Sequence, residues 1–325
     1  QGDWSSDVCS SDLENYFEFR NFLIHDSKGN TGRANGRFNH SYFTNFDFDV
    51  RLDVSKFEGL HTAAAQNDLY YGNAFVTGYA NFEGPVESMK LDMQLRSEKG
   101  SEIYIPLSSS SELSRSSYIT FINRNDTGET QKALRHFNPS GITLDLRFEV
   151  TNDATIEIIF DEKIGDKIKG NGTGNLRFTL DEGGSFNIFG NYFINKGDYL
   201  FTLQNIINKH FTIDNGTINW NGDPYDADIN LTAYYKGGTS TLYKVVPEDS
   251  TLRRRLNYEV VLYLTKKLMN PAINYEIKVS GLDNATAGTA YSRLNSEAEL
   301  TRQVFGLMLL NQLDRKSTRL NSSHL

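Results

Sequence analysis

The sequence predicts an all-β fold, an elongated antiparallel sheet rolled into a trough and followed by a C-terminal amphipathic helix. Apolar and polar residues alternate through most of the 325 residues, which is typical of strands with one dry and one wet face. Short turns rich in Gly, Asn and Asp separate these runs, and short connections favour antiparallel neighbours. Because strands stack about 4.8 Å apart, about fifteen of them would form a rod or trough roughly 70 Å long.

The clearest strand is residues 46–54, FDFDVRLDV, where Phe46, Phe48 and Val50 lie on one side and Asp47 and Asp49 on the other. The same alternation predicts strands in residues 89–95, 142–150, 176–180, 186–194, 199–203, 211–213, 218–220, 229–235, 258–264 and 273–279. The turns between the later strands are predicted at residues 181–184, 195–198, 214–216 and 221–224.

Two segments break the alternation. Residues 106–134 are rich in Ser and polar, and are predicted to form a long loop; they contain no G-x-S-x-G motif that would indicate a catalytic serine. Residues 296–313 have helical spacing, with Ser296 and Glu299 forming a capping box before an apolar stripe of Leu300, Val304, Leu307 and Leu310 or Met308. Its polar face is poor in Lys and Arg, which favours packing over the sheet edge or trough mouth rather than on a membrane surface.

The two ends of the chain do not resemble protein sequence. Residues 3–13 (DWSSDVCSSDL) and 314–324 (DRKSTRLNSSH) are encoded by opposite strands of one DNA sequence. This reciprocity is typical of a sequencing-library adapter translated at both ends, and we interpret residues 1–13 and 314–325 as artefactual tails. The remaining chain divides into a β-rich repetitive region, residues 14–140, and a C-terminal domain, residues 141–313.

Composition narrows the function classes. The formal net charge is −8 and no basic cluster is present, so nothing favours binding to nucleic acid or an anionic membrane. The single cysteine, Cys9, lies in the tail, which argues against disulfides and zinc-thiolate sites. Histidines are dispersed without metal-ligand spacing, and no cofactor or metal is expected. No apolar run approaches the ~20 residues of a membrane helix.

One acidic cluster invites a chemical interpretation. Asp223, Asp226 and Asp228 lie in DNGTINWNGDPYDADINLTA, residues 214–233, and resemble the first half of a calcium loop. The downstream bidentate acid is missing, and Pro224 presets a turn, so a turn between two strands is favoured. A hydrolase using Asp223 and Asp226 is the less favoured alternative, for which loss of activity in Asp226→Asn would be the sign. Residues 170–176, GNGTGNL, lack the following helix that a phosphate loop needs.

The apolar strand faces are the other candidate site. If the sheet closes, they form only a core; if it stays open, they form a hydrophobic groove suited to acyl chains or unfolded apolar strands, and the sequence leaves both open. The groove candidates, which share the apolar face of the later strands, are Tyr199, Phe201, Leu203, Ile218, Trp220, Ile229, Leu231, Val260, Leu262, Tyr275 and Ile277.

Four motifs occur in order between residues 141 and 312: IIFDEKIGDKIKG (158–170), GDYLFTLQNIINKHFTI (197–213), INWNGDPYDADI (218–229) and ELTRQVFGLMLLNQ (299–312). This part resembles the C-terminal domain of the TamB translocation and assembly module proteins, in their Bacteroidetes-type form. Residues 14–140 resemble the preceding repetitive β region only loosely. Residues 278–291 (KVSGLDNATAGTAY) depart from the proline-bearing turn expected there, which leaves the strand-to-helix link open.

The resemblance implies a bacterial cell-envelope protein without catalytic residues. Such a protein would be anchored in the inner membrane by an N-terminal helix outside this sequence, cross the periplasm as an apolar-lined trough, and work with an Omp85-family (TamA-like) outer-membrane protein. It would act in outer-membrane protein assembly or secretion and in phospholipid transport, so its cargo would be phospholipid or nascent outer-membrane protein. The alternative hypothesis is an extracellular β-rich adhesin or glycan-binding module, which exposed aromatic side chains on the polar face would favour.

Overall fold

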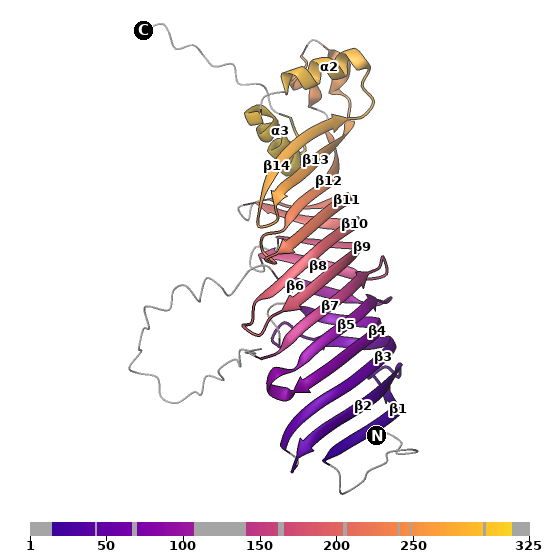
Figure 1. Ribbon diagram of the computed structural model, residues 1–325. Coiled ribbons are helices and arrows are strands. Elements are labelled where there is room, and N and C mark those ends of the chain that lie inside the picture. The colour runs from indigo at the N-terminus through magenta and orange to yellow at the C-terminus, as the bar shows by residue number, and fades with distance from the viewer. Residues whose placement is uncertain are drawn as a thin grey trace, which may run out of the picture.

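The computed structural model describes residues 15–42, 44–66, 70–106, 141–161, 166–203, 207–239, 241–247, 249–294 and 297–313. One sheet of fourteen strands dominates, and its strands stack along an elongated axis with the helices at the C-terminal end (Figure 1). The predicted all-β fold with a C-terminal helix is therefore confirmed. The expected tails, almost all of the expected loop at residues 106–134 and the predicted cap Ser296 lie outside the described residues.

The strands follow the chain with few departures from sequence order. They are β1 (Tyr16–His25), β2 (Thr31–Ser41), β3 (Thr44–Thr62), β4 (Tyr71–Pro85), β5 (Lys90–Ser97), β6 (Glu102–Pro106), β7 (Thr143–Val150), β8 (Thr155–Asp161), β9 (Asp166–Leu180), β10 (Phe186–Leu203), β11 (Ile207–Gly222), β12 (Asp228–Thr239), β13 (Leu256–Lys267) and β14 (Asn270–Val279). The helices are η1 (Val86–Ser88), η2 (Leu242–Lys244), η3 (Ser250–Arg253), α2 (Asn284–Arg293) and α3 (Glu297–Leu310).

Two strand pairs in the middle of the sheet differ from the expected antiparallel order. β5 pairs with β7 and β6 pairs with β8 in parallel, whereas the other pairs among the described strands are antiparallel. A parallel pair needs a connection of a dozen or more residues, which the chain supplies between the end of β6 at Pro106 and the start of β7 at Thr143. Short connections still join antiparallel neighbours, as the sequence predicts at residues 181–184 and 221–224. The turns predicted at residues 195–198 and 214–216 are wrong, because these residues lie within β10 and β11, where the pairing only shifts register.

The long strands β4 and β9 each pair with two short strands. β9 pairs with β8 along its first part and with β7 along its second, and β4 pairs with β6 and β5 in the same manner. Where β5 ends and β6 begins, buried hydroxyls bind the interrupted backbone. Ser97 Oγ accepts from the amide of Thr151 at 2.9 Å, and Ser101 Oγ accepts from that of Phe75 at 3.0 Å. These bonds pair backbone polar groups that would otherwise lose their hydrogen-bond partners where the strand pairing is interrupted.

Burial rises along the stack. The continuous hydrophobic core begins near Val150 and extends to Leu313, whereas the described apolar side chains of β1 to β3, apart from the buried Ala34, are half-buried or exposed. At the C-terminal end, α3 inserts Val304, Leu307 and Met308 completely into that core. Of the helical stripe predicted from the sequence, Val304 and Leu307 are packed and Leu300 is half-buried. Met308, and not Leu310, completes the packed face, since Leu310 is 68% exposed. None of the described helices is long and apolar enough to cross a membrane.

The link from β14 to α3 contains a second helix that the sequence did not predict. α2 begins after Asp283, whose carboxylate accepts hydrogen bonds from the amides of Ala285 and Thr286 at 3.0 Å each. This is a regular N-terminal cap. Arg293, in the last turn, donates at 2.8 Å to the carbonyl of Val245 and ties α2 to the segment between β12 and β13.

Candidate functional site: the apolar face of the sheet

Cross-strand register makes the apolar face continuous. One row runs through Leu52, Ala80, Met93, Leu146, Phe178 and Ile188, each directly opposite the next on the neighbouring strand. Because side chains alternate between the faces of a strand, such a row keeps every member on the same side of the sheet. The apolar face therefore spans β3 to β10 without a polar interruption in this row.

The candidate residues whose side chains are described lie on the continuation of this face across β10 to β14. Nine of them are buried: Tyr199, Phe201, Ile218, Trp220, Ile229, Leu231, Val260, Leu262 and Ile277. Tyr275 is half-buried, and the side chain of Leu203 lies outside the described part of the chain. The register places Ile218 opposite Ile229, Val260 opposite Ile277, and Leu262 opposite Tyr275. The structure thus gathers nine candidates in one packed cluster, with Tyr275 packed against it.

An aromatic ladder runs through this cluster and includes residues that the sequence analysis did not name as candidates. Ring centroids of Phe201 and Phe211, and of Phe211 and Tyr235, are 5.9 Å apart, and Tyr235 lies 6.4 Å from Tyr258. Such spacing is that of favourable edge-on or tilted aromatic pairs. The alternation that defined the strands was the available signal for Phe211, Tyr235 and Tyr258.

The tyrosines of this face are held neutral. Burial raises the pKa of Tyr192 and Tyr275, and burial followed by the nearby Asp166 carboxylate raises the pKa of Tyr199. Burial raises the pKa of Tyr258 to about 12. A phenol with a raised pKa stays protonated near neutral pH, so these side chains add hydrogen-bonding groups without adding charge.

A second aromatic group lies at the other end of the sheet, where the face is accessible. Phe17, Phe38, Phe46 and Phe48 are half-buried and their rings form a chain across β1 to β3. Centroids of Phe38 and Phe48 are 5.9 Å apart. The alternation predicts the strand at residues 46–54, but the groove candidates all lie in the region of specific resemblance, so these rings are not among them. These rings are the accessible counterpart of the buried cluster.

The C-terminal helices cover the last strands of the apolar face. α3 contacts β14 and β11, and Phe305 lies 6.4 Å from the ring of Tyr275. An open hollow of about 540 Å³ remains between the edge of β14 and these helices, lined by Ile273, Tyr275, Ile277, Tyr291 and Leu300 among others. α3 therefore covers part of the last strands, including the candidate Tyr275 on β14.

The acidic cluster forms the turn between β11 and β12. Asp223 accepts a hydrogen bond from the amide of Tyr225 at 2.9 Å, which stabilises the turn. Asp226 and Asp228 lie 3.0 and 3.1 Å from the Lys267 ammonium. Within the described ranges, no group of three His, Cys, Asp or Glu side chains has metal-site geometry. The carboxylates are thus engaged by one lysine and one backbone amide.

The fold and the apolar face together define an elongated β-sheet protein whose hydrophobic side runs the length of the sheet and is covered by helices at its C-terminal end. The chain matches the TamB C-terminal domain over residues 20–324 and belongs to that family. The family is a non-enzymatic translocation and assembly module of the cell envelope that works with an Omp85 partner. No curated protein matches the chain.

Proposed function

We propose that this chain forms part of a non-enzymatic conduit across the periplasm, in which the apolar face shelters acyl chains of phospholipids or apolar strands of nascent outer-membrane proteins. The observation that carries the proposal is the continuity of that face, which passes from accessible rings on β1 to β3 to the packed cluster under α3. An exposed apolar surface of this extent is normally a binding surface.

Two parts of the face have different roles in this proposal. The accessible rings, represented by Phe38 and Phe48, contact cargo directly. The nine buried candidates on β10 to β14 contact cargo when α3 moves away from the sheet, because the surrounding side chains now exclude other molecules. The cargo passes as an apolar chain that exchanges contacts from one row of side chains to the next.

The envelope context completes the proposal. The protein is anchored in the inner membrane, lies in the periplasm and delivers cargo to a TamA-like Omp85-family protein in the outer membrane. Family membership and the amphipathic sheet support this arrangement. Outer-membrane protein assembly or secretion and phospholipid transport both follow from an apolar face, because both cargoes present apolar surface that water excludes.

Site-specific photocrosslinking in cells, within the full-length protein, tests the proposal. A photoreactive residue at Phe48 is expected to capture phospholipid or outer-membrane protein, and one at Asp49, its neighbour on the opposite face of β3, is expected to capture neither. Probes at Phe201 and Leu231 are expected to capture the same cargo during transport. Recovery of no cargo from any of the three apolar positions would contradict the proposal.

A further inference from the structure

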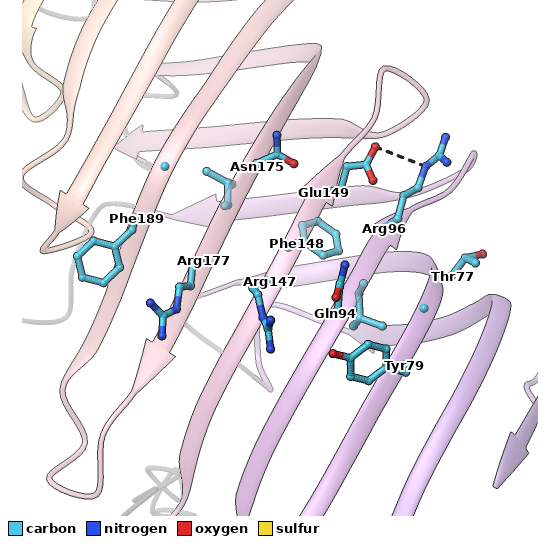
Figure 2. A pocket seen from close by; sticks show the side chains of 14 residues that line it. Thr77, Tyr79, Gln94, Arg96, Arg147, Phe148, Glu149, Asn175, Arg177 and Phe189 are labelled. Carbon is cyan, nitrogen blue, oxygen red and sulfur yellow. Dashed lines mark ion pairs between the residues drawn. The ribbon is translucent and has the colours of Figure 1, made fainter.

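A groove lies on the outer, polar face of the sheet, opposite to the apolar face. It has a volume of about 590 Å³ and crosses β4, β5, β7, β9 and β10. Figure 2 shows its side chains standing along these strands. One cross-strand row consists of Tyr79, Gln94, Arg147, Arg177 and Phe189, each directly opposite the next. At about 4.8 Å per strand, the row is roughly 19 Å long, which fits an extended ligand.

Glycine kinks explain why a flat strand array forms a hollow here. Gly78 and Gly190 lie at the two ends of the groove, with φ of +146° and +117°. A side chain at either position would collide with the carbonyl of the neighbouring strand, Gln94 for Gly78 and Asn175 for Gly190. Glycines of this kind bend a sheet locally, so the wall between them curves.

The charges of the groove are balanced. Arg147 lies 2.6 Å from Asp92, Arg177 donates two hydrogen bonds of 2.9 and 2.8 Å to Asp145, and Arg96 lies 3.8 Å from Glu149. The Arg177 guanidinium holds the pKa of Asp145 below its ordinary value. An anionic ligand would have to displace these carboxylates, so charge complementarity favours a neutral ligand instead.

The remaining chemistry suits a ligand rich in hydroxyl groups. A guanidinium has five N–H donors, and Arg147 directs one hydrogen bond to Asp92. Gln94, Asn175 and Glu149 add amide and carboxylate groups that accept hydrogen bonds from hydroxyls. Phe189 presents an apolar ring that is 37% exposed at one end of the row. Planar polar side chains beside an exposed ring match the alternation of hydroxyls and C–H faces on a sugar.

We propose that this outer groove binds a stretch of neutral polysaccharide chain. A peptide strand is disfavoured because all five strands of the groove are internal to the sheet and offer no open edge for strand addition. Sugar rings lie along the row from Tyr79 to Phe189, accept hydrogen bonds from Arg147 and Arg177, and stack on Phe189. The site is independent of cargo on the apolar face and would hold the protein against a glycan of the envelope.

The chain offers a matched control on the same strand. Phe193 lies four residues from Phe189 on the same face of β10 and is 47% exposed, but it does not line the groove. Binding of chitohexaose, cellohexaose and maltohexaose to the full chain is measured by calorimetry. At least one is expected to bind saturably, more weakly by on the order of tenfold in Phe189→Ala and unchanged in Phe193→Ala. Phe48→Arg, on the opposite face, is expected to leave glycan binding unchanged.

Thermal unfolding of each variant confirms that the sheet is intact. A loss of glycan binding in Arg147→Gln and Arg177→Gln with unchanged unfolding supports the proposal. Three results would overturn it: no saturable binding of any of the three hexasaccharides, equal effects of the Phe189 and Phe193 variants, or steeply salt-dependent binding of heparin in their place, which would assign the groove to an anionic ligand.

Discussion

The hydroxyl of Tyr258 on β13 lies 2.8 Å from both the carbonyl of Leu307 and Oδ1 of Asn311, so a buried strand residue shares its one hydrogen with two acceptors at the end of α3. Leu313 adds a backbone bond of 2.6 Å to the hydroxyl of Thr241 nearby. These contacts fix the helical cover over the apolar cluster, because they leave its polar groups satisfied only while α3 stays in place.

Tyr258→Phe removes the donor and leaves the ring in place. The free energy of unfolding is expected to fall by about 1–2 kcal/mol, because the two acceptors at the end of α3 lose their partner. Urea unfolding measures the change. Tyr263→Phe is the control, since its hydroxyl binds Glu276 at 2.7 Å on the outer face, away from α3. Equal losses of unfolding free energy in the two variants would show that the hydrogen bond from Tyr258 to α3 contributes no more stability than the one from Tyr263.

Alkaline pH is expected to loosen the same contact. The pKa of Tyr258 is raised from its ordinary value of 10.0 to about 12 in the folded chain. Because the pKa is higher in the folded than in the unfolded chain, the protonated phenol stabilises the fold at pH values below the pKa of the unfolded chain. That stabilisation is lost as pH rises from about 10 to about 12. Unfolding measured across this range is expected to show a smaller pH dependence in Tyr258→Phe than in the original chain. The same pH dependence of unfolding in Tyr258→Phe and in the original chain would contradict this role of Tyr258.

The turn between β1 and β2 is expected to respond to acid. Desolvation opposes the shift, but hydrogen bonds from Asn30, Glu58 and Lys28 lower the pKa of Asp26 from 3.8 to about 2. Because the pKa is lower in the folded than in the unfolded chain, the ionised carboxylate stabilises the fold at pH values above the pKa of the unfolded chain. That stabilisation is lost as pH falls from about 3.8 to about 2. NMR titration of the carboxyl checks this, and a midpoint at the ordinary value would refute it. Asp26→Asn is expected to remove this part of the acid dependence.

Arginine substitution distinguishes the accessible and packed ends of the apolar face. Leu262 is fully buried, so Leu262→Arg is expected to lower the free energy of unfolding by more than about 4 kcal/mol, because it buries a charge without a partner. Phe48 is half-buried, and Phe48→Arg is expected to cost about 1 kcal/mol while blocking cargo crosslinks. Denaturant unfolding separates the two. Similar large losses would mean that the accessible end is also a closed core.

The acidic turn is expected to tolerate neutralisation. In Asp226→Asn, Lys267 keeps its ion pair with Asp228, and the exposed pair that is lost contributes about 0–1 kcal/mol. Thermal unfolding and cargo crosslinking are expected to remain close to those of the original chain. A loss of cargo crosslinking in this variant with unchanged unfolding would instead assign a functional role to the Asp226 carboxylate.

Alternation predicted most strands and the helical spacing predicted α3, because both patterns are local. Two features depend on residues far apart in the sequence, so no local pattern predicts them. They are the parallel pairing of β5 with β7 and the hydrogen bonds of the Ser97 and Ser101 hydroxyls. Helix α2 was missed because NATAGTAYSR has little apolar periodicity. The outer groove was also unpredictable, since it depends on five strands in register.

The same long-range features bear on how well the candidate site was anticipated. The ten candidates with described side chains share one face of the strands, but alternation alone is the same for a dry core and an open groove. The difference depends on what packs against the face. α3 contacts β14 and β11 among the later strands, whereas Phe38 and Phe48 stay half-buried. Burial is thus a tertiary property that the pattern leaves undetermined.

The parallel pairing in the middle of the sheet has a practical consequence for protein engineering. A parallel pair accepts any connection long enough to return the chain, and the cost of lengthening a loop grows only slowly with its length. The stretch between Pro106 and Thr143, most of which the sequence predicts to be a loop, is therefore where a fluorescent domain or an epitope would be inserted. A tag placed there would leave the register of β5 with β7 and of β6 with β8 unchanged, and would make the protein visible in living cells.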